Sequence, residues 1–499
     1  MDRDLLAWCA FGTYVLLTTV LALRGMKKTK DFDGFALGNG DLGPVMVGIT
    51  LAAAIASTAT FVINPGFVYV HGVSALMHLG LAASAGVIVA LLVLSRGFRK
   101  LGKKTAALTL PHWVGARFGH RGMRTYFALL NLLLAVAFVV LIVKGSALVM
   151  QHTLGLGYAA SVLVIVGFVF SYILLGGTYA HVYTNAFQGA LMVVVALVIF
   201  GSGLYLLGDG VGPFLDQLAA QDPNLVDPVN ATSPFFGSTW DVFVCGFVVG
   251  AGLTCQPHIL TKSLYLSSER DLRRYLVVSV GVGVIFALVL VAGLYARIRF
   301  PGIESQDAVM PVYLTRAFGP MTGVLISVAL LAAGMSTLDG LLVSASTIAA
   351  NDLVLGQLGD RLLRNTDPER RQQIALKTSR VILVLMGVVS AGMALDPPEL
   401  VGIFAQVGVY GLVAASLAPI TLGVFVDDLD ARYVFAAALV GPGVHFTHYL
   451  ISVYGLGTFV NPASTATEGV FVSFGLLGLL EGVRRLRRRR SPALVGSGR

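Results

Sequence analysis

Residues 50–66 read TLAAAIASTATFVINPG, an apolar run of small side chains that ends in Asn64-Pro65-Gly66. A second such run, FVVGAGLTCQPHIL at residues 247–260, ends in Gln256-Pro257-His258. Proline removes a backbone donor and clashes with the carbonyl group four residues earlier, so a helix in lipid accepts it only where neighbours or a cavity satisfy the freed groups. Both runs are therefore expected to be broken membrane helices; the alternative is two ordinary proline kinks in packed helices.

The whole chain has the composition of an integral membrane protein. Of its 499 residues, 56% are hydrophobic and 12% are charged. Apolar runs of roughly 18 or more residues recur, each long enough to cross about 30 Å of hydrocarbon as a helix. The alternating ten-residue strands of a barrel are absent, and the three cysteines have no ligand-like spacing. We expect an all-α membrane protein with one transmembrane domain over residues 1–499.

The apolar runs predict about thirteen helices. They lie near residues 5–23, 43–70, 74–95, 125–149, 158–176, 186–207, 238–260, 275–296, 321–347, 379–395, 400–426, 432–453 and 467–481. The second to sixth helices, residues 43–207, and the seventh to eleventh, residues 238–426, form two five-helix blocks, and each block opens on a broken helix. Broken helices at matching places in two oppositely oriented halves predict inverted repeats with a transport site near the bilayer midplane. The other helices are peripheral.

The distribution of positive charge explains the net charge of +9. With the N-terminus outside, the Lys and Arg residues cluster on the cytoplasmic side, as the positive-inside rule requires, and Lys262 falls in a cytoplasmic connection. The exceptions among the 35 are four residues outside and one within the membrane: Arg3, Arg297, Arg299, Arg316 and Lys144. The basic cytoplasmic tail, residues 484–499, is expected to contact anionic membrane lipid and no nucleic acid. The expected location is the plasma (inner) membrane, with the C-terminus cytoplasmic.

A third stretch, AAGMSTLDGLLVSAS at residues 332–346, places polar groups inside an apolar helix. At about 100° per residue, a narrow face carries Ser336, Thr337 and Ser344, with Asp339 on its flank. Hydroxyl oxygens suit a small hard cation; the structural alternative is hydroxyls bonded to the preceding turn. The carboxylate favours an ion pathway, because an ionisable group at this depth is costly.

Five motifs together resemble the sodium/solute symporter family, which has the inverted-repeat fold of the leucine transporter and includes pantothenate, acetate, proline and sugar cotransporters. The motifs are LGNGDLGPVMVGITLAAAIASTATFVINPG, GG followed by YTNAFQGALM, GLTCQPHIL, AAGMSTLDGLLVSASTIAANDL and GIFAQVGVYGLVAASLAPI. The resemblance covers nearly the whole chain.

The resemblance implies a sodium ion (Na+) between the second and ninth helices. The ligands implied are the backbone carbonyl oxygens of Ala53, Ala56 and Ala333 and the hydroxyls of Ser336 and Thr337. Pro65 frees a carbonyl only near Phe61, so unwinding as far as Ala53 and Ala56 is implied by the resemblance alone.

The resemblance also bears on the number of sodium ions. Relatives with a second sodium carry an aspartate on the sixth helix where this chain has Asn185. An amide keeps the oxygen and loses the charge, although Asp339 could replace that charge from the opposite side. One sodium per cycle is favoured, with Asn185 and Asp339 as the candidate second cation site.

Candidate solute-binding residues are the polar groups within the apolar helices: Thr60, Asn64, His78, Lys144, Gln256 and Gln406. Lys144 needs an anionic partner, which would be Asp339 or a solute carboxylate, unless its side chain extends to the outer face. His78 fits a hydrogen-bonded core histidine as well as a ligand. Proline transporters of the family that this chain resembles have aromatic residues on the seventh helix at the positions of Val249 and Leu253. A pantothenate-like or monocarboxylate-like solute is therefore favoured over proline.

These patterns predict a sodium-coupled symporter that imports a small, carboxylate-bearing organic solute by alternating access. A proton-coupled symporter with Asp339 as the carrier is the alternative, followed by a membrane sensor that does not transport. An enzyme or a primary pump is not expected, because the sequence has no nucleophile or metal-ligand cluster and no GxxxxGK[ST] phosphate loop. The oligomeric state is not indicated.

Overall fold

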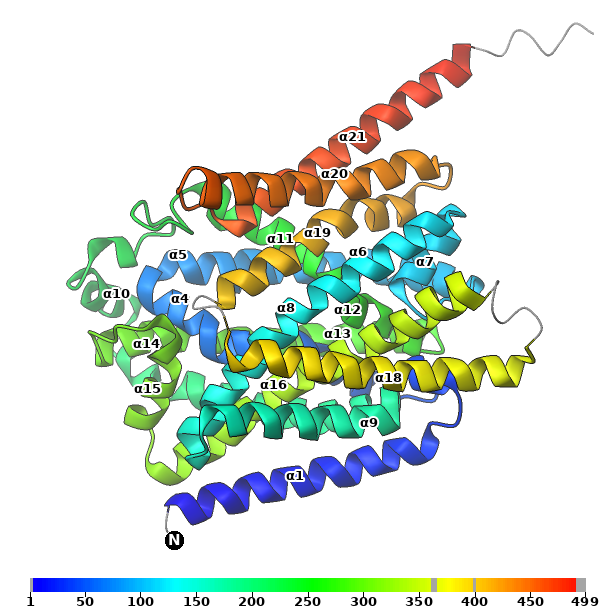
Figure 1. Cartoon of the computed structure of the whole chain (residues 1–499). Coiled ribbons are helices and arrows are strands. Elements are labelled where there is room, and N and C mark those ends of the chain that lie inside the picture. Colours follow the sequence, from blue (N-terminus) through cyan, green and yellow to red (C-terminus); the bar gives the residue numbers. More distant parts are fainter. Residues whose placement is uncertain (1–2, 360–365, 398–400, 491–499) are drawn as a thin grey trace, which may run out of the picture.

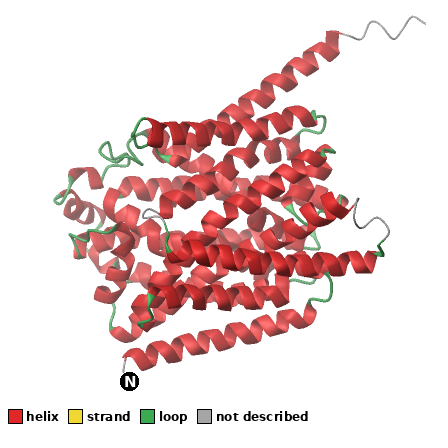
Figure 2. Ribbon diagram, viewed as in Figure 1, coloured by secondary structure: helices red, strands yellow, loops and turns green. Residues whose placement is uncertain are grey.

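The computed structural model describes residues 3–359, 366–397 and 401–490, and over these residues it is helical without any strand (Figure 2). In this part of the chain ten helices are long and apolar enough to cross a membrane, or up to twelve when two bent pairs each count as one span. The predicted all-α membrane fold is confirmed. The number thirteen and the two inverted repeats stay predictions.

The long spans include several that continue through short 3₁₀ or π segments, labelled η. They are α1 (Arg3–Lys28), α5 (Val73–Leu76) with η2 (Met77–Ala83) and α6 (Ser84–Lys104), α8 (Arg121–Leu154), α9 (Tyr158–Gly201), α13 (Glu269–Ala287) with η7 (Leu288–Val291) and α14 (Ala292–Arg299), α16 (Pro320–Ile348) with η9 (Ala349–Leu358), α18 (Pro368–Leu395), α19 (Val401–Phe425), α20 (Ala431–Leu450) with η10 (Ile451–Gly455), and α21 (Pro462–Arg490).

The two bent pairs are α3 (Pro44–Ile55) with η1 (Ala59–Ile63) and α4 (Asn64–His71), and η5 (Trp240–Cys245) and α11 (Gly246–Thr254) with α12 (Pro257–Leu260) and η6 (Thr261–Tyr265). Shorter helices occupy the connections: α2 (Phe32–Ala36), α7 (Leu110–Phe118), η3 (Leu204–Leu207), α10 (Val211–Ala219), η4 (Pro223–Leu225), η8 (Gln306–Ala308) and α15 (Val309–Ala317). Figure 1 shows α1 along one side of the bundle and α20 and α21 along the opposite side, with α8 and α16 between them.

Helix α9 consists of two helices that meet at a kink. As one straight helix, its 44 residues would measure about 66 Å at 1.5 Å per residue, roughly twice the thickness of the hydrocarbon layer. The chain is interrupted inside it at Gly177, where φ is 52° and ψ is −137°, a conformation that glycine adopts without a steric penalty. The expected connection over residues 177–185 is therefore wrong, because the helix resumes directly after Gly177 and ends at Gly201.

Glycines set the spacing around the second bent pair. A Cβ atom on Gly86 of α6 would lie 2.1 Å from the carbonyl oxygen of Phe247, and one on Gly250 of α11 would lie 2.0 Å from that of Ala83. Neither distance leaves room for a side chain, so the backbones of α6 and α11 touch. Close approach through small residues is a common way for membrane helices to associate, and here it fixes α11 in place.

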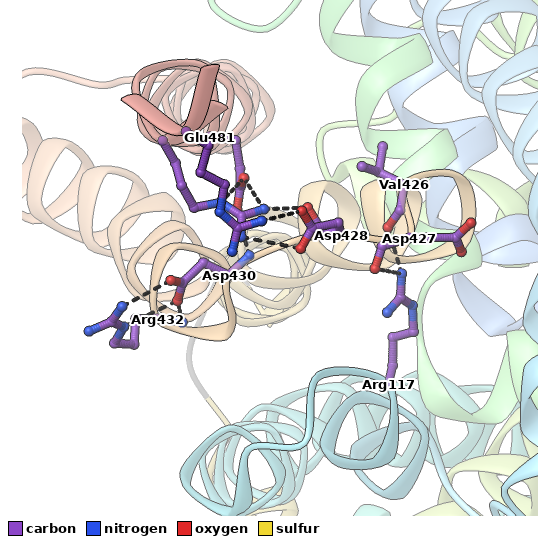
Figure 3. Close-up of polar contacts among 9 residues, drawn as sticks. Arg117, Val426, Asp427, Asp428, Asp430, Arg432 and Glu481 are labelled. Atoms are coloured by element: carbon purple, nitrogen blue, oxygen red, sulfur yellow. Dashed lines mark hydrogen bonds and ion pairs between the residues drawn. The ribbon is translucent and has the colours of Figure 1, made fainter. Parts of the chain in front are cut away.

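Arginine side chains hold the connection between α19 and α20 to α7 and α21 (Figure 3). Arg117 of α7 donates to the carbonyl oxygens of Gly423 and Val426 at the end of α19. Arg484 of α21 forms ion pairs with Glu481 at 2.7 Å and Asp428 at 3.2 Å. Helix α21 thus extends past the predicted end at residue 481 and carries the start of the basic tail, whose first arginine binds acidic groups of the protein itself. Residues 491–499 lie outside the described residues.

Candidate functional site

The second helix is unwound at Ala56 and Ser57, well before the proline that predicts the break. Helix α3 ends at Ile55, η1 begins at Ala59, and the two halves are bent by 56°. Pro65 instead lies in the first turn of α4, directly after the π segment, where the wider turn accommodates a residue without an N–H group. The predicted break of this helix is therefore present, but it lies at the residues where the resemblance implied unwinding and not at the proline. In the second bent pair the break does lie at the proline: Pro257 begins α12 after a 62° bend.

The unwound turn frees two carbonyl oxygens. In a continuous helix the carbonyl of each residue accepts a hydrogen bond from the amide four residues on. Here the amide of Ser57 donates to Ile55 at 3.1 Å and the amide of Thr60 donates to Ser57 at 3.0 Å. The carbonyl oxygens of Ala53 and Ala56 therefore lack their usual helical donors.

The hydroxyls of α16 meet this unwound turn. The Oγ atom of Ser336 lies 2.9 Å from the carbonyl oxygen of Ala53 and 2.8 Å from that of Ala333. The Oγ1 atom of Thr337 lies 3.5 Å from the Ala333 carbonyl oxygen. Four of the five predicted sodium ligands thus form one connected group of buried oxygens, and Ala56 lies at the adjoining break. Neutral oxygens at such spacing suit a hard cation such as sodium.

Asn185 and Asp339, the candidate second cation site, lie next to this group. The Nδ2 atom of Asn185 on α9 donates to the carbonyl oxygen of Ser336 at 2.7 Å, while its buried Oδ1 atom has no hydrogen-bond partner among the residues that the structure describes. The two oxygens of Asp339 accept hydrogen bonds from the hydroxyl of Tyr172 and, at 2.9 Å, from that of Thr184. Tyr172 and Thr184 both belong to α9, and sequence reasoning did not identify them as site residues.

Lys262 is a buried residue of this site, which corrects its assignment to a cytoplasmic connection. Its side chain is 1% exposed, and its ammonium group donates to the carbonyl oxygen of His258. The Nζ atom lies 3.5 Å from the position that a Cβ atom would take on Gly340, the residue after Asp339. Lys144 is therefore not the only lysine within the helical bundle.

Helix length carries the signal that could have located Lys262. The first half of the bent pair, residues 240–254, covers only about 22 Å at 1.5 Å per residue, less than the roughly 30 Å of hydrocarbon. The chain must therefore continue past Pro257 before it leaves the membrane. Lys262 lies within this continuation, on η6.

A cavity of about 650 Å³ adjoins the unwound turn, within the range of roughly 300–1,000 Å³ of small-molecule sites. Its lining is mostly apolar. Four of the six predicted solute-binding residues line it: Thr60, Asn64, His78 and Gln406. His78 is also tied to the backbone, because its Nδ1 atom lies 2.7 Å from the carbonyl oxygen of Asp241. Among the described residues around this cavity there is no Lys or Arg.

The other two predicted solute-binding residues lie elsewhere. Gln256 lines a separate cavity of only about 20 Å³ together with Pro257 and His258. Lys144, half-buried on α8, does not line the large cavity. The anionic partner suggested for it, Asp339, is hydrogen-bonded to the hydroxyl groups of Tyr172 and Thr184 on α9.

Known proteins similar to this chain are membrane transporters. The sodium/pantothenate symporter of Haemophilus influenzae is 26% identical over 484 residues, covering 96% of this chain and 95% of that protein. The sodium/pantothenate symporter of Escherichia coli is 25% identical over 453 residues, covering 90% of this chain and 91% of its own length. The relatives support a transport function and argue against an enzyme.

The fold also has a counterpart among solved structures. A Na+-coupled sialic acid symporter, solved in a substrate-bound outward-open state, superposes with a TM-score of 0.77 at 18% identity and covers 97% of this chain and 98% of its own. The sequence profile of the Sodium:solute symporter family matches residues 35–441, most of the chain. The chain therefore belongs to the sodium:solute symporter family.

Proposed function

We propose that the protein is a sodium-driven symporter that imports a small carboxylate-bearing solute with a largely apolar body. Family membership supports sodium-coupled solute symport. The observation that carries the proposal is the contact of Ser336 with the freed carbonyl oxygen of Ala53, 2.9 Å apart, at the break of a membrane helix. On ion binding the hydroxyl hydrogen of Ser336 turns away, and both oxygens become available to sodium together with those of Ala56, Ala333 and Thr337.

The solute is proposed to bind in the 650 Å³ cavity. Its walls favour an apolar body, and Asn64, Thr60 and Gln406 supply neutral hydrogen-bond groups. The helix from Ala59 to His71 begins at this cavity. The positive end of its dipole favours a carboxylate there without a lysine or arginine, as in other transporters with broken helices. The relatives named for pantothenate, itself a carboxylate, agree with this choice.

Sodium is favoured over a proton as the coupling ion. Both oxygens of Asp339 are already engaged by the hydroxyl groups of Tyr172 and Thr184. The five oxygens at the unwound turn, in contrast, include no group that carries a proton in and out. Alternating access then follows if sodium fixes the unwound turn and completes the solute cavity before the bundle reopens on the other side.

We further propose that this multi-pass protein lies in the plasma membrane with the N-terminus outside and the C-terminus in the cytoplasm. The contacts of Arg117 and Arg484 then face the cytoplasm (Figure 3). Arg488, which is exposed and forms an ion pair with Asp428 at 2.8 Å, would lie on the same side as anionic lipid headgroups.

Uptake into proteoliposomes tests this function. Purified protein is reconstituted, and accumulation of labelled pantothenate and of a panel of monocarboxylates is measured under an imposed sodium gradient or an imposed proton gradient. We expect the sodium gradient alone to drive accumulation, and a neutral amide analogue of the same solute to be transported poorly. Accumulation driven by protons with no response to sodium would overturn the proposal.

A further inference from the structure

The strongest unassigned feature is the buried ammonium group of Lys262. It lies on η6 and is enclosed by α16, where the absence of a side chain at Gly340 leaves space for it: its Nζ atom would be 3.5 Å from a Cβ atom there. The imidazole of His181 also lies next to Gly340, with its Cε1 atom 3.3 Å from the position of a Cβ atom on that glycine. A lysine in such surroundings is costly unless an anion balances it.

Asp339 supplies the balancing charge. It is fully buried and directly precedes Gly340 on α16, the residue at which the Lys262 side chain ends. The two do not form a direct ion pair among the described residues; the carboxylate oxygens are bonded to Tyr172 and Thr184 instead.

The oxygens around Asp339 have the chemistry of a cation site. Thr184 contributes a hydroxyl oxygen 2.9 Å from the carboxylate. Its neighbour on α9, Asn185, carries a buried amide oxygen that has no hydrogen-bond partner within the described part of the chain. A carboxylate, a hydroxyl and an amide oxygen are ligands that small hard cations prefer. The cationic group that the structure places nearby, at Gly340, is the ammonium group of Lys262.

We propose that Lys262 acts as a tethered cation that takes the place of a second sodium ion at Asp339 and so limits transport to one sodium ion per solute. This rests on the sodium coupling proposed above and extends it to the ion stoichiometry. A free cation at Asp339 would enter and leave in each cycle and add to the driving force, whereas a tethered ammonium returns with the protein. Lys262 is thus a residue that determines stoichiometry, separate from the Ser336 and Thr337 ligands.

Radioactive sodium binding to the purified full-length protein, without solute, tests the proposal. We expect one sodium ion per chain for the wild type and for Lys262→Arg, which keeps the charge. Lys262→Met removes the charge and is expected to bind two ions. The double variant Lys262→Met with Asp339→Asn removes both charges and is expected to return to one.

Each count also has an outcome that refutes the proposal. Two ions on the wild type, or one ion on a folded Lys262→Met at unchanged affinity, would overturn it while leaving sodium coupling intact. A wild type that binds no sodium would refute the coupling and the inference together.

A second measurement applies if Lys262→Met does not fold. Asp339→Asn leaves the ammonium unbalanced near the Ser336 site, so we expect its sodium affinity to fall by roughly fivefold or more from Coulomb repulsion. The double variant should regain folding and bind sodium within about twofold of the wild type, since neither charge remains. Losses that simply add in the double variant would show that the two charges are not coupled and would overturn the proposal.

Discussion

Replacing Thr337 with alanine tests the sodium site with little disturbance to the fold. Its Oγ1 atom lies 3.5 Å from the carbonyl oxygen of Ala333, at the outer limit of a hydrogen bond. Ser336 instead makes contacts of 2.9 and 2.8 Å with Ala53 and Ala333, so removing its hydroxyl would also weaken the link between α3 and α16. The loss in Thr337→Ala should therefore fall mainly on the sodium-bound state.

The expected loss follows from the contact that is removed. A hydrogen-bond-type contact to a charged group contributes about 1.5–3 kcal/mol, and about 1.4 kcal/mol corresponds to a tenfold change in dissociation constant. Thr337→Ala should therefore weaken sodium binding by roughly 10- to 150-fold. Thr337→Ser keeps the oxygen and loses only the methyl group, so it should stay close to the wild type.

The assay is sodium titration of the purified protein, by radioactive sodium binding, together with the sodium concentration that gives half-maximal uptake. Both quantities should shift by the same factor in Thr337→Ala, while the melting temperature without sodium stays near that of the wild type. Wild-type sodium affinity in Thr337→Ala would remove this residue from the site. An equal loss in Thr337→Ser would show that the methyl group and not the hydroxyl is what matters.

Two further predictions concern the solute cavity and the helix packing. Asn64→Ala should raise the solute concentration for half-maximal uptake by roughly two- to tenfold, the effect of one neutral hydrogen bond. Lys144→Met should change this concentration less, because the Lys144 side chain does not line the cavity. A larger effect of Lys144→Met than of Asn64→Ala would place the solute at α8. Gly250→Ala, whose Cβ atom would lie 2.0 Å from the carbonyl oxygen of Ala83, should lower the melting temperature through an overpacking cost of about 1–3 kcal/mol. The control Gly281→Ala meets nothing within 4 Å, and equal losses in the two variants would contradict the packing argument.

The sequence was sufficient for the helical face of α16 because that face depends on local periodicity. Ser336 and Thr337 were placed on one side of a helix by their spacing alone, and both lie in the buried oxygen group. The location of the break in the second helix had no such local signal. Alanine is the strongest helix former, yet the chain unwinds at Ala56, because the carbonyl oxygen of Ala53 finds its donor on α16, far along the sequence.

Lys262 shows a different limit of sequence reasoning. Counting positive charges assigns a lysine after an apolar run to the cytoplasmic side, and for most residues that logic is sound. It fails for Lys262 because this side chain is buried against Gly340 of α16, and a local count of charges carries no information on contacts with another helix. The same applies to the α9 hydroxyls of Tyr172 and Thr184, which matter only because α9 packs on α16.

The proposed sodium site and the solute cavity share one piece of backbone. Ala56, whose carbonyl oxygen lacks its helical donor, also lines the cavity, as does the adjacent Ser57. An ion that fixes the carbonyls of Ala53 and Ala56 therefore fixes part of the cavity wall, and a solute resting on that wall favours the same conformation of the turn. Because such coupling is reciprocal, the solute must tighten sodium binding by the factor by which sodium tightens solute binding. A break at Pro65 would lie beyond Ala56 and leave this turn helical, so the displacement of the break from the proline is what brings ion and solute onto the same residues.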